Sequence, residues 1–276
     1  MITRLLKSLY RFEQKYFGGL GLENLAVAQK IKALLFPMIY PSQVKFAGFD
    51  LELDPIYGFT DPEKYKPYII SFIQKNLRPG DVAVDLGANI GLLTLFMSRA
   101  VGRRGKVLAF EPGQRNLKLL RKNLSINGCN NVQVFEYAVG ETNRPVFLPD
   151  RGAHNAIGEK ETNRVKLVPL DDFLSKADLI KMDIIGSEPK ALQGMRKLIA
   201  ASPQLKIITA FCPAYIRKQG RDPLVFLADL HALGFSLEVS HNVDLPYSLD
   251  PEKFESLTQD YSKGIAQVEI ICKSRQ

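Results

Sequence analysis

The sequence predicts an α/β fold: a seven-stranded, mostly parallel sheet with helices on both faces and an antiparallel last strand. From residue 65 onward, short apolar runs alternate with stretches of helical periodicity, which is the pattern of parallel strands joined by crossover helices. The last two apolar runs, 235–240 and 265–273, are joined only by residues 241–263, which we expect to be extended, so the final strand should be antiparallel. With 276 residues, of which 46% are hydrophobic, the chain can bury one sizeable core.

The individual elements follow from this periodicity. Strands are expected where apolar and β-branched residues run together, at 82–88, 106–112, 131–139, 179–185, 205–211, 235–240 and 265–273. Helices are expected at 65–77, 92–101, 116–127, from about 188, and at 223–233. An insert at about 140–172 separates the third and fourth strands and holds two short strands, at 144–149 and 164–170. An insert of this length at the ligand edge of a sheet commonly covers a binding site.

Residues 1–64 are predicted to form an N-terminal element of their own, and residues 65–276 the main domain. Two helices, at 2–17 and 23–35, precede a β-hairpin at 44–54. The first helix carries apolar residues on one face and Arg and Lys on another. It would therefore either pack on the main domain with a solvated basic face or make a peripheral contact with an anionic membrane. Its apolar face would also suit a homodimer, so this element is expected to be a cap or an oligomerisation element.

The charge and the cysteines narrow the class of protein. The formal net charge is +8, which is compatible with nucleic acid, an anionic membrane or a phosphorylated substrate and selects none of them. The three cysteines, Cys129, Cys212 and Cys272, are far apart and lack metal-ligand spacing, which indicates a reducing compartment. No apolar stretch is long enough to span a bilayer, and none follows the first basic residues as in a signal peptide. A cytoplasmic location, with or without peripheral membrane contact, is expected.

The strongest local motif is the glycine-rich turn in GDVAVDLGANIGLLT. Asp85 ends an apolar strand, Gly87 and Gly91 flank the turn, and a helix follows. Glycines let the backbone approach a ligand closely, and the helix start offers unpaired N–H groups. The next strand ends with Glu111, where a carboxylate can bind both hydroxyls of a ribose. Because an acid before the turn suits a cationic amino-acid end better than a pyrophosphate, the motif predicts a site for S-adenosylmethionine.

The motifs DLGANIG and FEP, with the strand order inferred above, resemble the class I S-adenosylmethionine-dependent methyltransferases. The segments VPLDDF, LIKMDIIGSEPKALQGM and PQLKIITAFCP are similar to the FkbM-type family of that class, and the resemblance covers about residues 44–272. It implies a Rossmann-like sheet and methylation of a hydroxyl, often on a sugar or polyketide. By position, the cofactor-binding residues that it implies are Asp85, Gly87, Ala88, Asn89, Gly91, Glu111, Pro112, Asn116 and Ala138.

The sequence departs from the family pattern at two positions. The family usually carries a second acid in the fourth-strand motif, where this chain has Ile185. It also commonly carries Glu three residues before a Pro in the fifth strand, and the residue three before Pro213 is Ala210. Two acids expected at the mouth of the site are therefore replaced, while the cofactor-side motif is retained.

Three residues are candidates for the acceptor side of a methyl transfer, because an alcohol acceptor needs a base within hydrogen-bond reach. Asp183 lies at the carboxyl end of the fourth strand, beside the crevice where open α/β sheets bind ligands, although a carboxylate there can also hold the following turn. Glu188 is in the first turn of the next helix, where an acid suits the helix dipole, and His154 lies in the insert. No His/Cys/Asp cluster predicts a metal.

These observations predict S-adenosylmethionine-dependent O-methylation of a hydroxyl on a small molecule, sugar or glycan-like acceptor. Two alternatives remain open. The changes at Ile185 and Ala210 would suit a degenerate methyltransferase fold that binds cofactor or a partner without turnover. The +8 charge would suit an RNA methyltransferase. However, the chain has neither an Asn/Asp-Pro-Pro-aromatic motif nor a basic stretch with interspersed aromatic residues, which argues against nucleic acid.

Overall fold

The computed structural model describes residues 42–53, 65–148, 163–240, 246–261 and 266–275. The chain divides into two compact units, Met1–Glu63 and Lys64–Gln276. The helices expected at 2–17 and 23–35 lie outside the described residues.

The described part of the first unit is a β-hairpin. Strands β1 (Gln43–Phe46) and β2 (Phe49–Glu52) pair antiparallel, which confirms the expected hairpin. Ala47 and Gly48 form the turn, and both are left-handed, with φ of 50° and 79°. Two left-handed residues give a turn whose twist matches that of the paired strands.

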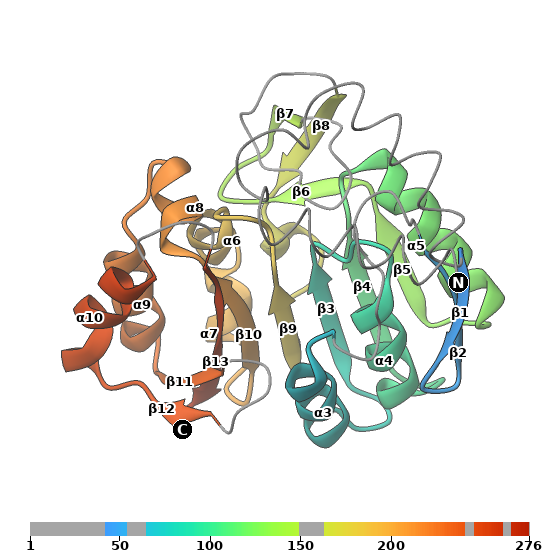
Figure 1. Ribbon diagram of the computed structural model, residues 1–276, viewed down its shortest axis with the longest axis horizontal. Coiled ribbons are helices and arrows are strands. Elements are labelled where there is room, and N and C mark those ends of the chain that lie inside the picture. The colour runs from blue at the N-terminus through green and yellow to red at the C-terminus, as the bar shows by residue number, and fades with distance from the viewer. Residues whose placement is uncertain (1–41, 54–64, 149–162, 241–245, 262–265, 276) are drawn as a thin grey trace, which may run out of the picture. The chain divides into compact units, whose positions relative to one another are not determined.

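The second unit is built on an eight-stranded sheet of order β12-β11-β13-β10-β9-β3-β4-β5 (Figure 1). Its strands are β3 (Val82–Leu86), β4 (Lys106–Phe110), β5 (Val132–Phe135), β9 (Leu179–Met182), β10 (Lys206–Phe211), β11 (Phe235–Ser240), β12 (Tyr247–Ser248) and β13 (Val268–Ser274). Strands β5, β4, β3, β9 and β10 are parallel, and β13 lies antiparallel between β10 and β11. The Rossmann-like α/β class and the antiparallel last strand are thereby confirmed.

Helices connect these strands on both faces of the sheet. They are α3 (Pro67–Asn76), α4 (Leu92–Val101), α5 (Gln114–Ile126), α6 (Glu188–Gln193), α7 (Arg196–Ala200), α8 (Pro213–Lys218), α9 (Pro223–Ala232) and α10 (Phe254–Asp260). Helix α4 occupies the residues that were expected, because Gly91 and Gly102 bound it on both sides. Proline opens α3, α8 and α9, where a missing N–H costs no hydrogen bond.

Two expectations about individual elements are wrong. The run at 131–139 is not one strand, because it divides at Glu136 into β5 and β6, which belong to different sheets. The connection at 241–263 is not simply extended, because its described part contains α10 and the two-residue strand β12, the eighth of the sheet. Phe254 and Leu257, one helical turn apart, bury α10 against the core. A helix of this length is too short for its periodicity to stand out in the sequence.

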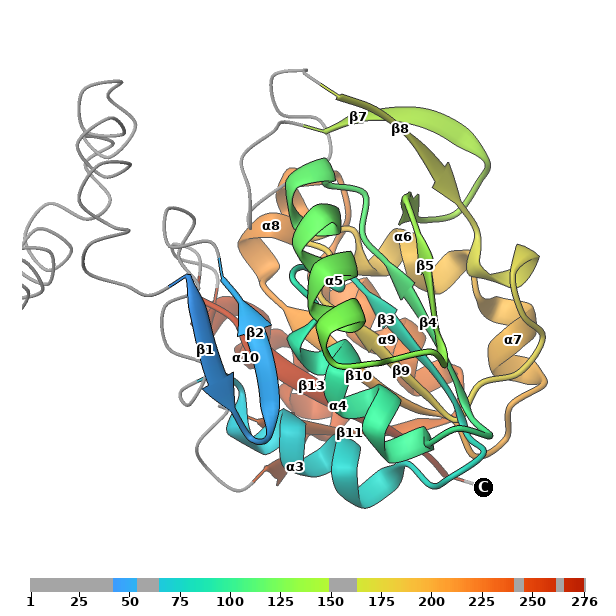
Figure 2. The same cartoon turned by 90° about the vertical axis from the view of Figure 1, so that its right-hand side faces the viewer.

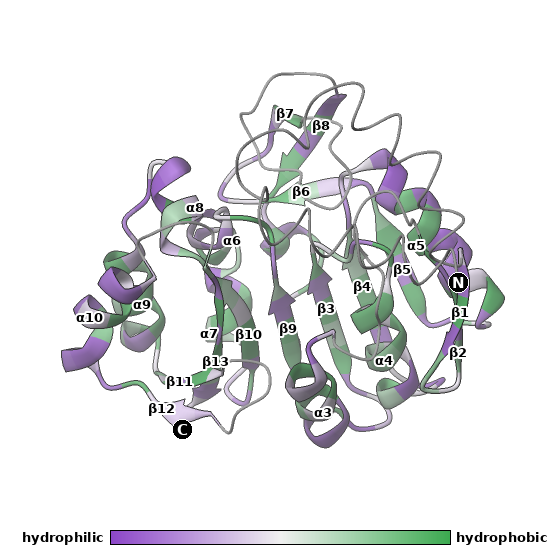
Figure 3. Cartoon of the chain, in the orientation of Figure 1, coloured by the Kyte–Doolittle hydropathy of each residue, from purple (hydrophilic) through white to green (hydrophobic). Residues whose placement is uncertain are grey.

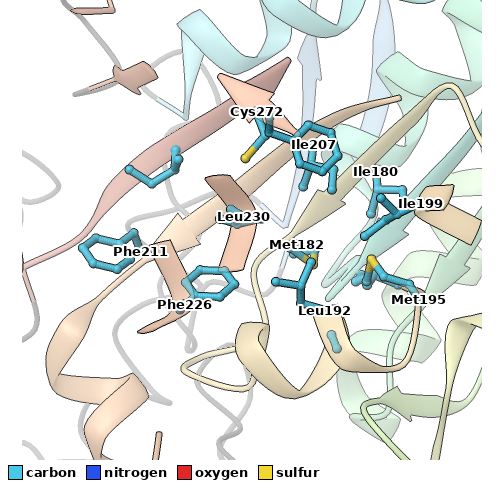
Figure 4. Packing of buried hydrophobic residues seen from close by; sticks show 14 of the residues in the cluster. Ile180, Met182, Leu192, Met195, Ile199, Ile207, Phe211, Phe226, Leu230 and Cys272 are labelled. Carbon is cyan, nitrogen blue, oxygen red and sulfur yellow. The ribbon is translucent and has the colours of Figure 1, made fainter. Parts of the chain in front are cut away.

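Side chains of the parallel strands alternate between two faces of the sheet. On one face, Met182 of β9 belongs to a large apolar cluster with residues of α6 to α10, and Figure 4 shows it beside Leu192 and Met195. On the other face, α4 packs on β3 and β4, and α3 packs on α4. The central strands are coloured largely hydrophobic in Figure 3, whereas α5 shows both kinds of residue. Each large aliphatic side chain buried in this way contributes about 1.5–3 kcal/mol to stability.

A second, three-stranded sheet confirms the strands expected in the insert. It has the order β6-β8-β7 and consists of β6 (Tyr137–Val139), β7 (Arg144–Leu148) and β8 (Asn163–Val168). It lies beyond the carboxyl ends of β3, β4 and β9 (Figures 1 and 2). A Cβ on Gly194, at the end of α6, would lie 1.9 Å from the carbonyl oxygen of Gly140, so the start of the insert packs tightly against α6. The small sheet therefore stands at the edge where ligands of such folds bind.

In the described part of the chain, no helix combines the length and the apolar composition needed to cross a membrane.

Candidate active site

The glycine-rich turn between β3 and α4 is held in a left-handed conformation. Gly87, Asn89 and Gly91 have φ of 77°, 53° and 93°. The N–H groups of Gly87 and Ala88 donate to the carbonyl oxygen of Phe110, at 2.9 and 3.0 Å, which fastens the turn to the end of β4. A Cβ on Gly87 would lie 2.2 Å from the carbonyl oxygen of Asp183. Only glycine therefore fits where the turn meets the end of β9.

Asp85 is fully buried below this turn and is neutralised from the neighbouring strand. Its Oδ2 accepts a 2.6 Å hydrogen bond from Oγ1 of Thr94 in α4. Nζ of Lys181 lies 3.2 Å from Oδ1 of Asp85, a charge contact without hydrogen-bond geometry, and donates to the carbonyl oxygen of Gly87 at 2.9 Å. Burial alone would lower the pKa of Lys181, but Asp85 and Asp183 outweigh it and raise that pKa. Lys181 is thus a buried cation that connects β9 to the turn.

Glu111 stands at the end of β4 and holds the other side of the turn. The N–H of Asn89 donates to Oε2 and the N–H of Gly113 to Oε1, both at 2.8 Å. Nδ2 of Asn116, in the first turn of α5, lies 3.4 Å from Oε1. Burial raises the pKa of Glu111, although these N–H donors oppose the shift. Oε1 thus has two donors, whereas Oε2 has one and keeps a lone pair that a ligand hydroxyl can use.

The structure therefore brings most of the predicted cofactor-side residues together around one turn: Asp85, Gly87, Ala88, Asn89, Gly91, Glu111 and Asn116. Pro112 follows Glu111 directly and is half-buried. Ala138 lies in β6 and packs into a small apolar cluster with Val146, Leu148, Val165 and Leu167 of the three-stranded sheet.

Asp183 is the first residue after β9 and faces the α3–α4 side of the sheet. Its N–H donates to the carbonyl oxygen of Leu86 at 3.0 Å, so its backbone continues the pairing with β3. Its Oδ2 accepts a 2.7 Å hydrogen bond from Nζ of Lys66, which lies immediately before α3. The same ammonium contacts Oε1 of Glu269 in β13 at 2.5 Å. The side chain of Asp183 is 22% exposed, so it is accessible to a ligand as well as paired.

Lys66 and Glu269 were not singled out from the sequence. A signal for Glu269 was present, because one acid interrupts the otherwise apolar run VEIIC of the last strand. In the sheet, Glu269 is the direct cross-strand partner of Ala210. The neighbouring strand thus places an acid beside the position where the family pattern has one.

The turn after Asp183 is strained at Ile185. This β-branched residue has φ 52°, a left-handed conformation that costs about 1–2 kcal/mol, and the following Gly186 has φ 84°. A Cβ on Gly186 would lie 2.4 Å from the carbonyl oxygen of Tyr215, so the turn is pressed against α8. Ile185 is half-buried. The apolar side chain therefore occupies a rigid, unfavourable position at the lip of the site.

Glu188 is buried and hydrogen-bonded to the turn that follows Asp183. It is 2% exposed, and its Oε1 accepts a 2.8 Å hydrogen bond from the N–H of Ile184, whereas Oε2 has no hydrogen-bond partner among the described residues. Burial raises the pKa of Glu188 to about 7, against the backbone N–H groups that lower it. The contacts of Glu188 are thus with its own turn. His154 lies outside the described residues.

Within the described ranges, no group of three or more His, Cys, Asp and Glu side chains is placed to hold a metal ion.

The small sheet carries an open cavity of about 440 Å³, lined by Asn143, Arg144, Pro145, Arg164, Val165 and Lys166. Nζ of Lys166 lies 5.7 Å from the ring centroid of Tyr137 on β6. As far as the structure describes the chain, the three cations of the cavity form no ion pair with a carboxylate. The cavity therefore presents several strong hydrogen-bond donors.

The burial of Glu188 predicts a loss of stability as pH rises. Because its pKa is near 7 in the folded protein against 4.5 in its ordinary state, the folded state binds more protons than the unfolded state between these values. The free energy of unfolding should therefore fall by about 3 kcal/mol from pH 4.5 to 8 through this group. Urea denaturation across this range should show the fall in the wild type and not in Glu188→Gln. The control Glu136→Gln, at an exposed surface glutamate, should keep it. An equal fall in Glu188→Gln would contradict the assignment.

Comparison with known proteins agrees with this geometry. The model of a family described as "Methyltransferase FkbM domain" matches residues 85–237, more than half of the chain. Among curated proteins, "Methyltransferase 1" of Beauveria bassiana (strain ARSEF 2860) is 26% identical in an alignment 143 positions long that covers 41% of this chain and 57% of that protein. "Methyltransferase sdnD" of Sordaria araneosa is 25% identical in an alignment 186 positions long that covers 52% of this chain and 71% of that protein.

A solved structure of methyltransferase FkbM from Methylobacillus flagellatus KT is 20% identical, covers 74% of this chain and 50% of its own, and has a TM-score of 0.46. The chain thus spans little more than half the length of some of the relatives that it matches. The family match itself extends from the acid of the glycine-rich turn to the strand β11, and so includes both halves of the site. The chain belongs to the FkbM family of S-adenosylmethionine-dependent methyltransferase domains.

Proposed function

We propose that this chain is an S-adenosylmethionine-dependent O-methyltransferase that acts on a hydroxyl of a small molecule, sugar or glycan-like acceptor. The observation that carries the proposal is the position of Asp183. Its carboxylate is partly exposed, and its carbonyl oxygen touches the glycine-rich turn at Gly87. A carboxylate is therefore available beside the turn that would hold the methyl donor.

The residues present fit S-adenosylmethionine. Oε2 of Glu111 keeps a lone pair for a ribose hydroxyl. The turn beside it packs through Gly87 directly on the carbonyl oxygen of Asp183. Asp85 is enclosed with Thr94 and Lys181, so it supports the turn through the bond from Lys181 to the carbonyl of Gly87. When bound, the cofactor would supply an electrophilic methyl group on a sulfonium. The protein would bind it, exclude water and align the acceptor oxygen.

On the acceptor side, Asp183 would orient the hydroxyl and accept its proton as the new bond to carbon forms. General-base assistance of this kind is worth roughly 10²–10⁴-fold in rate. The non-catalytic alternative was motivated by Ile185 and Ala210. This alternative is less favoured because Glu269 is the cross-strand partner of Ala210, and the Lys66 ammonium connects Glu269 to Asp183.

A sugar-like acceptor is favoured by the cavity on the small sheet. Sugar oxygens accept hydrogen bonds, which Arg144, Arg164 and Lys166 can donate. The cavity is on the sheet that stands at the carboxyl ends of the central strands (Figure 1). It would therefore hold the part of the acceptor that is not reacting.

Cofactor binding and transfer test the proposal together. Titration calorimetry should show binding of S-adenosylmethionine by the wild type and by Asp183→Asn, and weaker binding by Glu111→Ala, which removes the carboxylate that fastens the turn. A panel of sugars and glycans with methyl-labelled cofactor should give labelled product with the wild type. With Asp183→Asn, product formation should fall by roughly 10²–10⁴-fold. Absence of calorimetric binding by the wild type would refute the proposal, and full turnover by Asp183→Asn would remove Asp183 from it.

The cavity makes a separate prediction about affinity for the acceptor. Replacing Arg164 or Lys166 by Ser removes a charged hydrogen-bond donor worth about 1.5–3 kcal/mol. The KM for a glycan acceptor should therefore rise at least about tenfold, while the Kd for the cofactor stays unchanged. Lys118→Ser, on the exposed side of α5, is the matched control and should change neither value. Equal KM values for all these variants would place the acceptor elsewhere.

A further inference from the structure

We infer that Lys66, Asp183 and Glu269 form the acceptor site of this enzyme, and that it takes an uncharged hydroxyl as the reacting group. The inference rests on the proposed methyl transfer and goes beyond it, because it adds two residues from distant parts of the chain to the acceptor site. Lys66 and Glu269 are 203 positions apart in the sequence. Neither belongs to the matched family region 85–237.

The sheet register places Asp183 and Glu269 on the two sides of Ala210. Met182 of β9 pairs with Thr209 of β10, so the residues that follow them, Asp183 and Ala210, lie next to each other across the two strands. On its other side, Ala210 pairs with Glu269 of β13. Paired residues project from the same face of a sheet. The methyl group of Ala210 thus lies between two carboxylates and leaves room above it.

The ammonium of Lys66 occupies that room. It lies 2.7 Å from Oδ2 of Asp183 and 2.5 Å from Oε1 of Glu269, and the side chain of Lys66 is only 10% exposed. A larger side chain at position 210 would compete with the ammonium for the same space. Ala210 is therefore the residue that allows the cation to bridge the two acids, rather than a simple loss of an acid.

The backbone of Lys66 supports a specific role. Its φ and ψ are 46° and 52°, a left-handed conformation, and Pro67 follows. The residue before a proline favours extended conformations, and a left-handed non-glycine residue costs about 1–2 kcal/mol. Strain of this kind persists where surrounding contacts impose it, and it is concentrated at functional sites. The two ion pairs of the Lys66 ammonium are the contacts of this kind that its side chain makes among the described residues.

The charges of the cluster keep Asp183 ionised and therefore able to accept a proton. Burial by itself would lower the pKa of Lys66, but Asp183 and Glu269 outweigh it and raise that pKa well above its usual value, so the lysine stays an ammonium. It is therefore not the base. Instead it holds Asp183 as an oriented carboxylate, and Glu269, which is 2% exposed, anchors the ammonium.

The chemical step balances with these groups. The acceptor oxygen forms a bond to the methyl carbon, the bond from that carbon to sulfur breaks, and its electron pair stays on sulfur. The hydroxyl proton passes to Asp183 and then leaves to water through the exposed part of this side chain. While Asp183 is protonated, Lys66 remains paired with Glu269, so no buried ammonium is left without a counter-charge. Two carboxylates with one ammonium would repel a carboxylate or phosphate as the reacting group, which leaves an uncharged hydroxyl.

The test follows the titration of Asp183 in the full-length protein by ¹³C NMR of labelled aspartate, with Asp183→Asn to assign the signal. Lys66→Met should raise the titration midpoint of Asp183 by at least about one pH unit, because a cation in direct contact is lost. Glu269→Gln should lower the midpoint, because a neighbouring negative charge is removed while the ammonium stays. A merely structural bridge would give these shifts too, so the pH–rate profile of methyl transfer should move with the midpoint in both variants, which a structural role does not predict. Lys273→Met, which breaks the 2.6 Å pair with Glu238 on the same sheet, is the control and should leave the midpoint unchanged.

Binding and product analysis separate this inference from the proposed function. S-adenosylhomocysteine should bind the wild type, Lys66→Met and Glu269→Gln with Kd values within about twofold, since none of these residues contacts the glycine-rich turn. The methyl label on any product should be stable to mild alkali, as an ether is and a carboxyl ester is not. Failure of the wild type to bind would overturn the proposed function. If the wild type binds, three results would overturn the acceptor site alone. They are an unshifted Asp183 midpoint in Lys66→Met, a raised Asp183 midpoint in Glu269→Gln, and a methylated product that is labile to alkali. If Lys66→Met does not fold, the Glu269→Gln shift decides.

Discussion

The structure depends on a buried ion pair between neighbouring parallel strands, Asp85 of β3 and Lys181 of β9. Both side chains are almost completely buried, and Lys181 also donates to the carbonyl oxygen of Gly87. A buried pair is expensive to desolvate and contributes little net stability compared with apolar residues of the same volume. Its value here is geometric, because it fixes the glycine-rich turn relative to the strand that carries Asp183. One contact thus sets the distance between the two halves of the site.

The charged side chains form a layer on one face of the sheet. Asp85, Lys181, Asp183 and Glu269 all face the side of α3 and α4, because they alternate along their strands with residues of the large apolar cluster on the opposite side. Lys66, at the start of α3, completes this layer. The opposite face is packed with Met182 and its apolar neighbours and keeps the strands in register (Figure 4). The fold therefore separates stability and chemistry between the two faces of one sheet.

The sequence was sufficient to predict the fold and the glycine-rich turn around which most of the predicted cofactor-side residues lie, because both depend on local patterns. Helix α4 was predicted with its observed bounds, directly after the glycine-rich turn that ends at Gly91, and Asp85 and Glu111 were identified as acids that end apolar strands. The acceptor half depends on pairing between distant segments, which no local pattern encodes. From the sequence, Ala210 was interpreted as the loss of an acid, whereas the structure places Glu269 of β13 directly across from it. Likewise, Lys66 lies before a helix and gave no signal of its contact with Asp183.

The central claim is that the methyl donor lies between the glycine-rich turn and the Asp183 carboxylate that Lys66 holds. A crystal structure with S-adenosylhomocysteine tests it most directly. Its sulfur should lie within about 6 Å of the Asp183 carboxylate, a separation that allows an acceptor hydroxyl to reach both, with the Lys66 bridge to Glu269 intact. A sulfur turned away from Asp183, or bound on the other face of the sheet, would contradict the account.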